Sequence, residues 1–329
     1  SKLELLLKTI PRDNQCLPHG ESDSPQKIKS FEVITEIGRG GLGTVYLVYD
    51  HATGHERVLK VLNGDYPHNH RAIKKCLQSI KSLNKLGTAS LNTAAFIADT
   101  GSQPCLLGNY EQGIDLNERV RTCGPLSVPD ACRAITQAAI ALQKAHSVSV
   151  LHLNVKPANL FVNHVGQIMV LDCGLAAIVQ DTLAQADITT SVFVKESVNY
   201  MSPEQARNVS TADHRSDIYS LGCSLAFLIS GRTLFEYDSP LQTIVAHRSE
   251  SPPEVSGLTG DTAANLNQVV IRLLAKHPAD RYQSMQAVAA ALEPFLGDGL
   301  AVGDIISQPS IPSPARLLNW LHLKSRRRH

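Results

Sequence analysis

The first third of the chain contains short runs of β-branched and aromatic residues, separated by glycine or asparagine–glycine pairs. This pattern is typical of strands joined by tight turns. The runs lie at 31–37, 44–50, 57–62, 94–98 and 104–107. Between 71 and 86 apolar residues recur at helical spacing instead. The pattern therefore predicts a small sheet with one helix over residues 31–109.

Past Gly113 the pattern becomes mainly helical. Ser127 and Asp130 predict a capped start for an apolar helix that runs to His146. We expect a polar loop at 177–199. Further helices are expected at 216–230, 261–275 and 283–295.

Two apolar runs at 160–162 and 168–171 flank a turn, which predicts a short hairpin. Four polar residues stand at its open ends: Asn154, Lys156, Asn159 and Asp172. The hairpin would bring amide, ammonium and carboxylate groups to one place. Phosphoryl transfer from a magnesium-bound nucleotide needs such a cluster, because its catalysis is mostly positioning and charge neutralisation. Asn154 stands at the position where that chemistry requires a carboxylate to accept the substrate's proton.

Composition places the chain among ordinary globular proteins, with 43% hydrophobic and 19% charged residues. A formal net charge of +1 gives no reason to expect a nucleic-acid partner. The seven cysteines show no metal or redox spacing, which favours a reducing cytoplasm. No apolar run reaches the roughly 18 residues of a membrane span. We therefore expect a cytoplasmic location.

A glycine cluster at Gly38, Gly40 and Gly43 lies between two predicted strands, which argues against a dinucleotide-binding fold. Glycines allow backbone amides to approach phosphate oxygens closely. Lys60 follows in the next predicted strand. Taken alone, the glycine cluster fits an ordinary flexible turn equally well. Lys60 alone fits a solvated lysine on a strand equally well.

Taken together, the motifs resemble eukaryotic-like protein kinases in order and spacing. They are Gly38–Val45, Lys60, His152–Asn159, Asp172–Gly174, Ser202–Glu204, Asp217–Gly222 and Arg281. The segment 199–205 resembles bacterial, membrane-anchored Ser/Thr kinases most. The resemblance implies an α+β, bilobal fold with a β-rich N-lobe (31–109) and a larger, mainly helical C-lobe (110–296). An N-terminal extension (1–30) would precede it, and a linker with a basic tail (297–329) would follow.

The resemblance also implies a role for each matching residue, with ATP or ADP and magnesium as cofactors. The three glycines would cover the phosphates, Lys60 would hold the α and β phosphates, and Lys156 would steady the γ-phosphate. The adenine would lie between Val45 and Val58 above and Phe161 below. Asn159 and Asp172 match the two magnesium ligands. Structural roles fall to the Glu204–Arg281 ion pair and to Asp217, which would anchor the catalytic loop.

Two departures from the family pattern bear on activity. Asn154 replaces the catalytic aspartate, and an amide can orient a hydroxyl but cannot take its proton. Active members also pair the strand lysine with a helix glutamate, and no acidic residue lies between Tyr66 and Ile97. The expected glutamate position holds Cys76 or Ser79, depending on the alignment.

The sequence therefore favours a pseudokinase that still binds ATP or ADP with magnesium and acts by scaffolding or conformational signalling. A weakly active Ser/Thr kinase is the first alternative, and an interaction module without nucleotide is the second. Any of these implies a protein partner or substrate.

The C-terminal tail combines apolar residues around Trp320 with a basic cluster at Lys324 and 326–328. Such a segment is typical of a juxtamembrane sequence beside anionic lipid, and equally of a helix that packs on the C-lobe. The first interpretation would make the chain the cytoplasmic part of a membrane-anchored protein.

Overall fold

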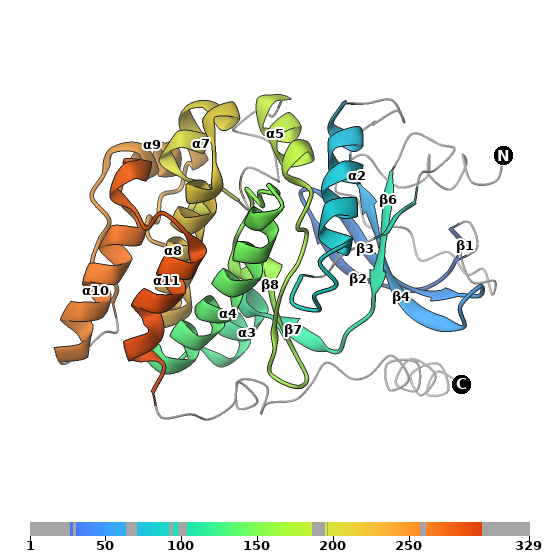
Figure 1. Ribbon diagram of the computed structural model, residues 1–329, viewed down its shortest axis with the longest axis horizontal. Coiled ribbons are helices and arrows are strands. Elements are labelled where there is room, and N and C mark those ends of the chain that lie inside the picture. The colour runs from blue at the N-terminus through green and yellow to red at the C-terminus, as the bar shows by residue number, and fades with distance from the viewer. Residues whose placement is uncertain are drawn as a thin grey trace, which may run out of the picture.

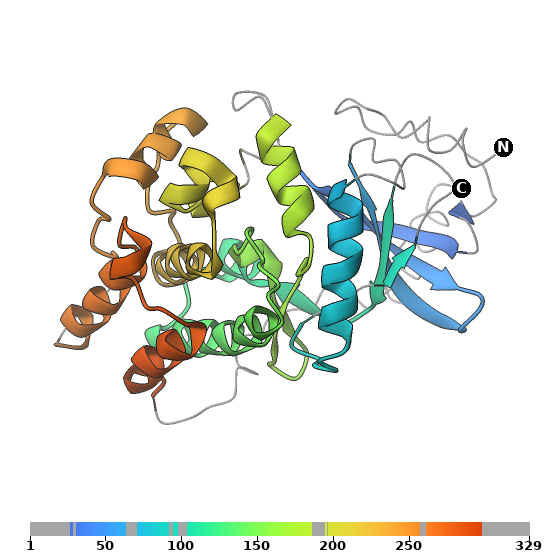
Figure 2. The same cartoon turned by 45° about the horizontal axis from the view of Figure 1, so that its top comes forward.

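A computed structural model describes residues 27–28, 31–63, 71–91, 95–97, 104–185, 195, 197–256 and 261–297. Its elements form two groups: a twisted sheet with one helix against it, and a larger helical group (Figures 1 and 2). This is the bilobal α+β architecture that the sequence predicts. Apart from Lys27–Ile28 and Gly297, the predicted N-terminal extension and tail lie outside the described residues.

The N-lobe sheet is antiparallel, in the order β1-β2-β3-β4-β6-β5. Its strands are β1 (Lys27–Ile28), β2 (Phe31–Gly40), β3 (Gly43–Asp50), β4 (His55–Leu62), β5 (Ala95–Ile97) and β6 (Cys105–Asn109). Val45 pairs with Lys60 across β3 and β4, and Val58 pairs with Gly108 across β4 and β6. Because paired residues share a face of the sheet, this register places Val45 and Lys60 on the same side.

Helix α2 (Arg71–Asn84) lies beside this sheet (Figure 1). Its buried residues are Ala72, Ile73, Cys76, Ile80 and Leu83, and the helix is basic elsewhere. That stripe follows the 3.6-residue period. The predicted helix is thus confirmed to within two residues.

The C-lobe is built around α8 (His214–Ser230), whose residues are buried almost throughout. Its N-terminus is capped by the Asp213 side chain, and it ends at Gly231, whose φ of +72° suits glycine. The other helices are α3 (Leu116–Cys123), α4 (Val128–Ser147), α7 (Pro203–Asn208), α9 (Pro240–Ser249), α10 (Asp261–Leu273) and α11 (Met285–Leu292). Small residues along α4, mostly alanine, allow it to pack closely on α8, α11 and the strand β9 (Ile168–Val170).

The predicted central hairpin is present as β8 (Leu160–Asn163) and β9, with β7 (Gly113–Asp115) pairing on the other side of β8. The turn is held by the Asn163 side chain, which accepts from the backbone N–H groups of Val165 and Gln167. Gly166 has a φ of +78°. The sequence pattern was sufficient to place these strands.

One prediction was wrong. The expected polar loop at 177–199 begins instead with a helix, α5 (Ala176–Gln185), which lies beside α2 in both views (Figures 1 and 2). Ile178 and Val179 are buried in an apolar cluster with Cys76 and Ile80 of α2. Tertiary packing therefore stabilises a helix that the polar composition of the wider segment concealed.

No described helix is both long and apolar enough to cross a bilayer.

Candidate functional site

The glycine-rich turn joins β2 to β3, and backbone packing requires glycine at its end. A Cβ at Gly43 would lie 2.2 Å from the carbonyl oxygen of Val61, so no other residue fits there without a shift. The Asn63 side chain donates to the carbonyl oxygens of Gly40 and Gly41, both at 3.2 Å. These bonds fix the turn against the end of β4.

Asp217, buried on α8, anchors the loop that carries Asn154. Its carboxylate accepts from the backbone N–H groups of His152 (3.0 Å) and Leu153 (2.7 Å), and it pairs with His146 Nε2 at 2.8 Å. Burial alone would raise the pKa of Asp217, but the His146 hydrogen bond and the nearby histidines hold it below its usual value. Leu153 has a φ of +58°, so these bonds also offset a strained backbone.

Asn154 is buried at the base of the site and behaves as a hydrogen-bond acceptor. Its Oδ1 accepts from the hydroxyl of Ser197 at 3.0 Å. Its backbone carbonyl accepts from Asn159 Nδ2 at 2.8 Å. An amide can therefore orient a hydroxyl here, but it has no basic lone pair to receive the proton.

Lys60 pairs with Asp172 at 2.5 Å, across 112 positions of sequence. Asp172 has a φ of +60° and follows β9, so the hairpin delivers its carboxylate to the β4 lysine. Burial would raise the pKa of Asp172, but the charge and hydrogen bond of Lys60, with His152 and Lys156, hold it lower than usual. The Asp172 carboxylate is therefore ionised at neutral pH.

Helix α2 offers Lys60 no carboxylate. Cys76 is fully buried, and burial raises the pKa of its thiol to about 11, against a smaller opposing effect from the backbone N–H groups of Ile178 and Ala177. Ser79, the other predicted position, is half-buried. Helix α5 thus covers Cys76, one of the two positions where an acidic partner for Lys60 would be expected.

A cleft of about 620 Å³ lies between the two lobes. The structure brings all but one of the predicted site residues to it: Gly38, Gly40, Gly43, Val45, Val58, Lys60, Asn154, Lys156, Asn159 and Asp172 line its wall. Phe161 is not among the described lining residues. Its ring packs instead near Gly113, where a Cβ would lie 2.6 Å from a ring carbon. The role of Phe161 under an adenine ring stays a prediction.

Sequence reasoning missed several polar side chains that line the cleft, among them Asp115, Asn117 and Lys195. Asp115 caps α3, its Oδ1 accepting from the backbone N–H of Glu118 at 2.9 Å, and burial raises its pKa. The Asp-x-x-Glu spacing could have indicated this cap. For Lys195 the sequence carried no signal, because its neighbours form no recognisable pattern.

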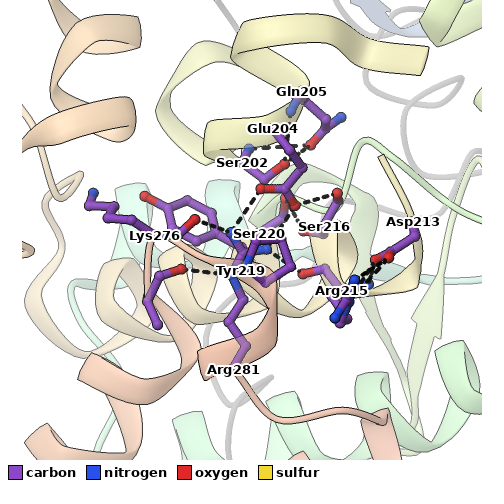
Figure 3. Close-up of polar contacts among 12 residues, drawn as sticks. Ser202, Glu204, Gln205, Asp213, Arg215, Ser216, Tyr219, Ser220, Lys276 and Arg281 are labelled. Atoms are coloured by element: carbon purple, nitrogen blue, oxygen red, sulfur yellow. Dashed lines mark hydrogen bonds and ion pairs between the residues drawn. The ribbon is translucent and has the colours of Figure 1, made fainter. Parts of the chain in front are cut away.

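Away from the cleft, Glu204 and Arg281 form a buried, bidentate ion pair (Figure 3). The two nitrogen–oxygen distances are 2.7 and 2.8 Å. Arg281 also donates to three backbone carbonyls, those of Ala275, Arg215 and Lys276. Burial would raise the pKa of Glu204, but Arg281 and the Ser216 hydroxyl hold it below its usual value. The predicted pair is present, and it ties α7 to the chain that follows α10.

Residues 31–292 match the family model described as a protein kinase domain. Among curated proteins, the chain is 34% identical over 271 residues to a probable serine/threonine-protein kinase, CE0033, of Corynebacterium efficiens. It is 32% identical over 266 residues to PknB of Mycobacterium tuberculosis and 28% identical over 263 residues to PrkC of Bacillus subtilis. Each alignment covers 80% of this chain and 40–42% of the relative. The chain thus spans about two fifths of the length of these relatives.

A solved structure with the same fold is the kinase domain of Mycobacterium tuberculosis PknI. The TM-score is 0.62 at 24% identity, covering 84% of this chain and 99% of that one. At that identity the likeness concerns the fold alone. The family model and the curated relatives show that the chain belongs to the protein kinase family, among the bacterial serine/threonine kinases.

Proposed function

We propose that this chain is a pseudokinase that binds ATP or ADP with magnesium in the interlobe cleft and acts through its conformation. One observation carries the proposal. The groups that would hold nucleotide and metal line the cleft together, while an amide occupies the position of the catalytic base and helix α2 carries no acidic residue.

The residues present fit a magnesium ion. Asp172 supplies an ionised carboxylate. Asn159 donates through its Nδ2 to the backbone carbonyl of Asn154, so the Oδ1 of Asn159 is left to bind a cation. Magnesium prefers such oxygen ligands and is held by one or two protein side chains together with substrate phosphates. A bound ion would neutralise phosphate charge. Lys60, Lys156 and the glycine turn would position the phosphates around it.

These residues would orient a substrate hydroxyl, but they would not take up its proton. A substrate hydroxyl could donate to Asn154 Oδ1 as Ser197 does, but its proton would have no acceptor there. Loss of a general base costs about 10²–10⁴-fold in rate. Lys60 is paired with Asp172 through one of the three N–H donors of its ammonium group.

A weakly active serine/threonine kinase is the second candidate. The loose transition state of phosphoryl transfer asks little of a base, and Lys60, Lys156 and both metal ligands line one cleft. Under either candidate we propose a protein partner or substrate on the cytoplasmic side of the membrane. Whether the tail lies beside a membrane stays a prediction, because the tail falls outside the described residues.

Intact-mass spectrometry after incubation with Mg-ATP distinguishes the two candidates. We expect no more phosphate on the wild-type chain than on a Lys60→Ala control. Asn154→Asp alone should raise transfer by less than about tenfold, because the helix carboxylate is still missing, although a base is worth up to ~10⁴-fold. Phosphorylation that is present in wild type and absent from Lys60→Ala would overturn the pseudokinase assignment. Strong transfer by Asn154→Asp would show that the missing helix glutamate does not limit the rate.

A further inference from the structure

Helix α9 carries an apolar stripe on its outer surface. Leu241 is 52% exposed and Val245 is 48% exposed, and their i, i+4 spacing puts them on one face. Tyr237 is 44% exposed, and its hydroxyl donates to the carboxylate of Glu250, with 2.9 Å to Oε2. That bond places its phenol beside the C-terminal end of the helix. We refer to Tyr237, Leu241 and Val245 as the α9 patch.

The α9 patch is a concentration of apolar surface rather than scattered exposure. Among the described residues, seven large apolar side chains are strongly exposed. Three of them fall within the nine positions 237–245. Single exposed apolar residues need no explanation, whereas a cluster rimmed by polar groups is typical of a contact surface.

Acidic residues flank the α9 patch in sequence, and we refer to them as its acidic rim. Four exposed carboxylates border it in sequence: Glu236, Asp238, Glu250 and Glu254. Between 236 and 254 the one exposed basic side chain is Arg248. A segment that covers this surface well would therefore combine an apolar stretch with basic residues next to it.

The chain itself contains such a segment. Residues 315–329 combine Leu317, Leu318, Trp320, Leu321 and Leu323 with Arg316, Lys324, Arg326, Arg327 and Arg328. We propose that this basic segment docks on the α9 patch of the same chain, with its apolar residues on Leu241 and Val245 and its basic residues facing the acidic rim. This contact does not depend on whether the interlobe cleft binds nucleotide.

The intervening chain is long enough. From Gly297, the last described residue, to Ala315 the backbone can span about 60 Å when extended. A folded domain of this size is roughly 50 Å across. Tethering gives an effective concentration in the millimolar range, so a contact with a dissociation constant of about 0.1 mM would be about 90% occupied. A weak contact is therefore sufficient to hold the segment on the domain.

Trp320 allows a direct test, because it is the only tryptophan in the chain. Its fluorescence reports on the basic segment without any label. In the full chain we expect a blue-shifted emission and an acrylamide quenching constant about threefold below that of the Leu241→Glu/Val245→Glu double variant, given the high occupancy expected for a tethered contact. Glu236→Lys/Glu254→Lys should release Trp320 as well, and added salt should weaken its protection.

Ile140→Glu is the matched control, since Ile140 is 49% exposed on α4, away from the α9 patch. It should leave Trp320 protected. The proposal fails if Trp320 is fully quenchable in wild type, or if its protection survives both double variants. Protection that disappears on dilution would assign the contact to a second copy. A blue shift that appears only with anionic vesicles would assign the segment to a membrane, and either result overturns docking within one chain.

Discussion

Replacing Arg281 with methionine should lower the free energy of unfolding by about 3–5 kcal/mol. The substitution keeps an unbranched side chain but leaves the Glu204 carboxylate without its partner, and an unpaired charge inside a protein is strongly destabilising. It also removes the donor for three carbonyls. Chemical denaturation monitored by circular dichroism would measure the change.

Arg121→Met provides the matched control. Arg121 forms an equally short pair with Glu118, at 2.6 Å, but its side chain is 69% exposed. An exposed pair contributes little to stability because water screens it, so Arg121→Met should be much milder. If Arg281→Met proved as mild as Arg121→Met, the Glu204–Arg281 pair would not hold α7 in place.

Cys76→Glu should also be strongly destabilising, by about 3 kcal/mol or more, although it introduces a carboxylate at one of the two positions predicted for the family glutamate. Cys76 is fully buried among Ile73, Ile80 and Ile178, so a carboxylate there would lose its hydration without gaining a partner. Thermal unfolding at neutral pH would measure the loss.

Ser79→Glu is the matched control at the other possible position of the family glutamate. Ser79 is half-buried on the same helix, so a glutamate there should change stability by no more than about 0.5 kcal/mol. If Cys76→Glu were tolerated equally well, α5 would not be packed as described, and α2 would be free to present a carboxylate to Lys60.

The sequence predicted those parts of the fold whose signals are local. Strand alternation and the turn at Asn163 and Gly166 located the β8–β9 hairpin, and the Ser127 cap located α4 to within a few residues. The cleft residues could be assigned because each lies in a motif with fixed spacing. The interpretation that Asn154 replaces a catalytic base rests on the same kind of spacing and stays a prediction.

The sequence could not predict features that depend on long-range packing. Helix α5 exists because Ile178 and Val179 meet Cys76 and Ile80, which are about 100 residues earlier in the chain. The Lys60–Asp172 pair likewise depends on how the lobes meet. The missing acid on α2 indicated that Lys60 lacked its usual partner, but no local pattern indicated which group replaces it.

Nucleotide binding is the central claim, and a thermal-shift titration with ATP and ADP, each with and without magnesium, tests it most directly. A ligand at a hundred times its dissociation constant stabilises the folded state by about 2.7 kcal/mol. For a domain of this size that corresponds to about 5–10 °C. We expect a magnesium-dependent shift of this size in wild type and its loss in Asp172→Ala, with each protein compared with its own melting temperature without ligand. The absence of any shift, at millimolar nucleotide and with or without magnesium, would contradict the account and leave the chain as an interaction module with a vestigial cleft.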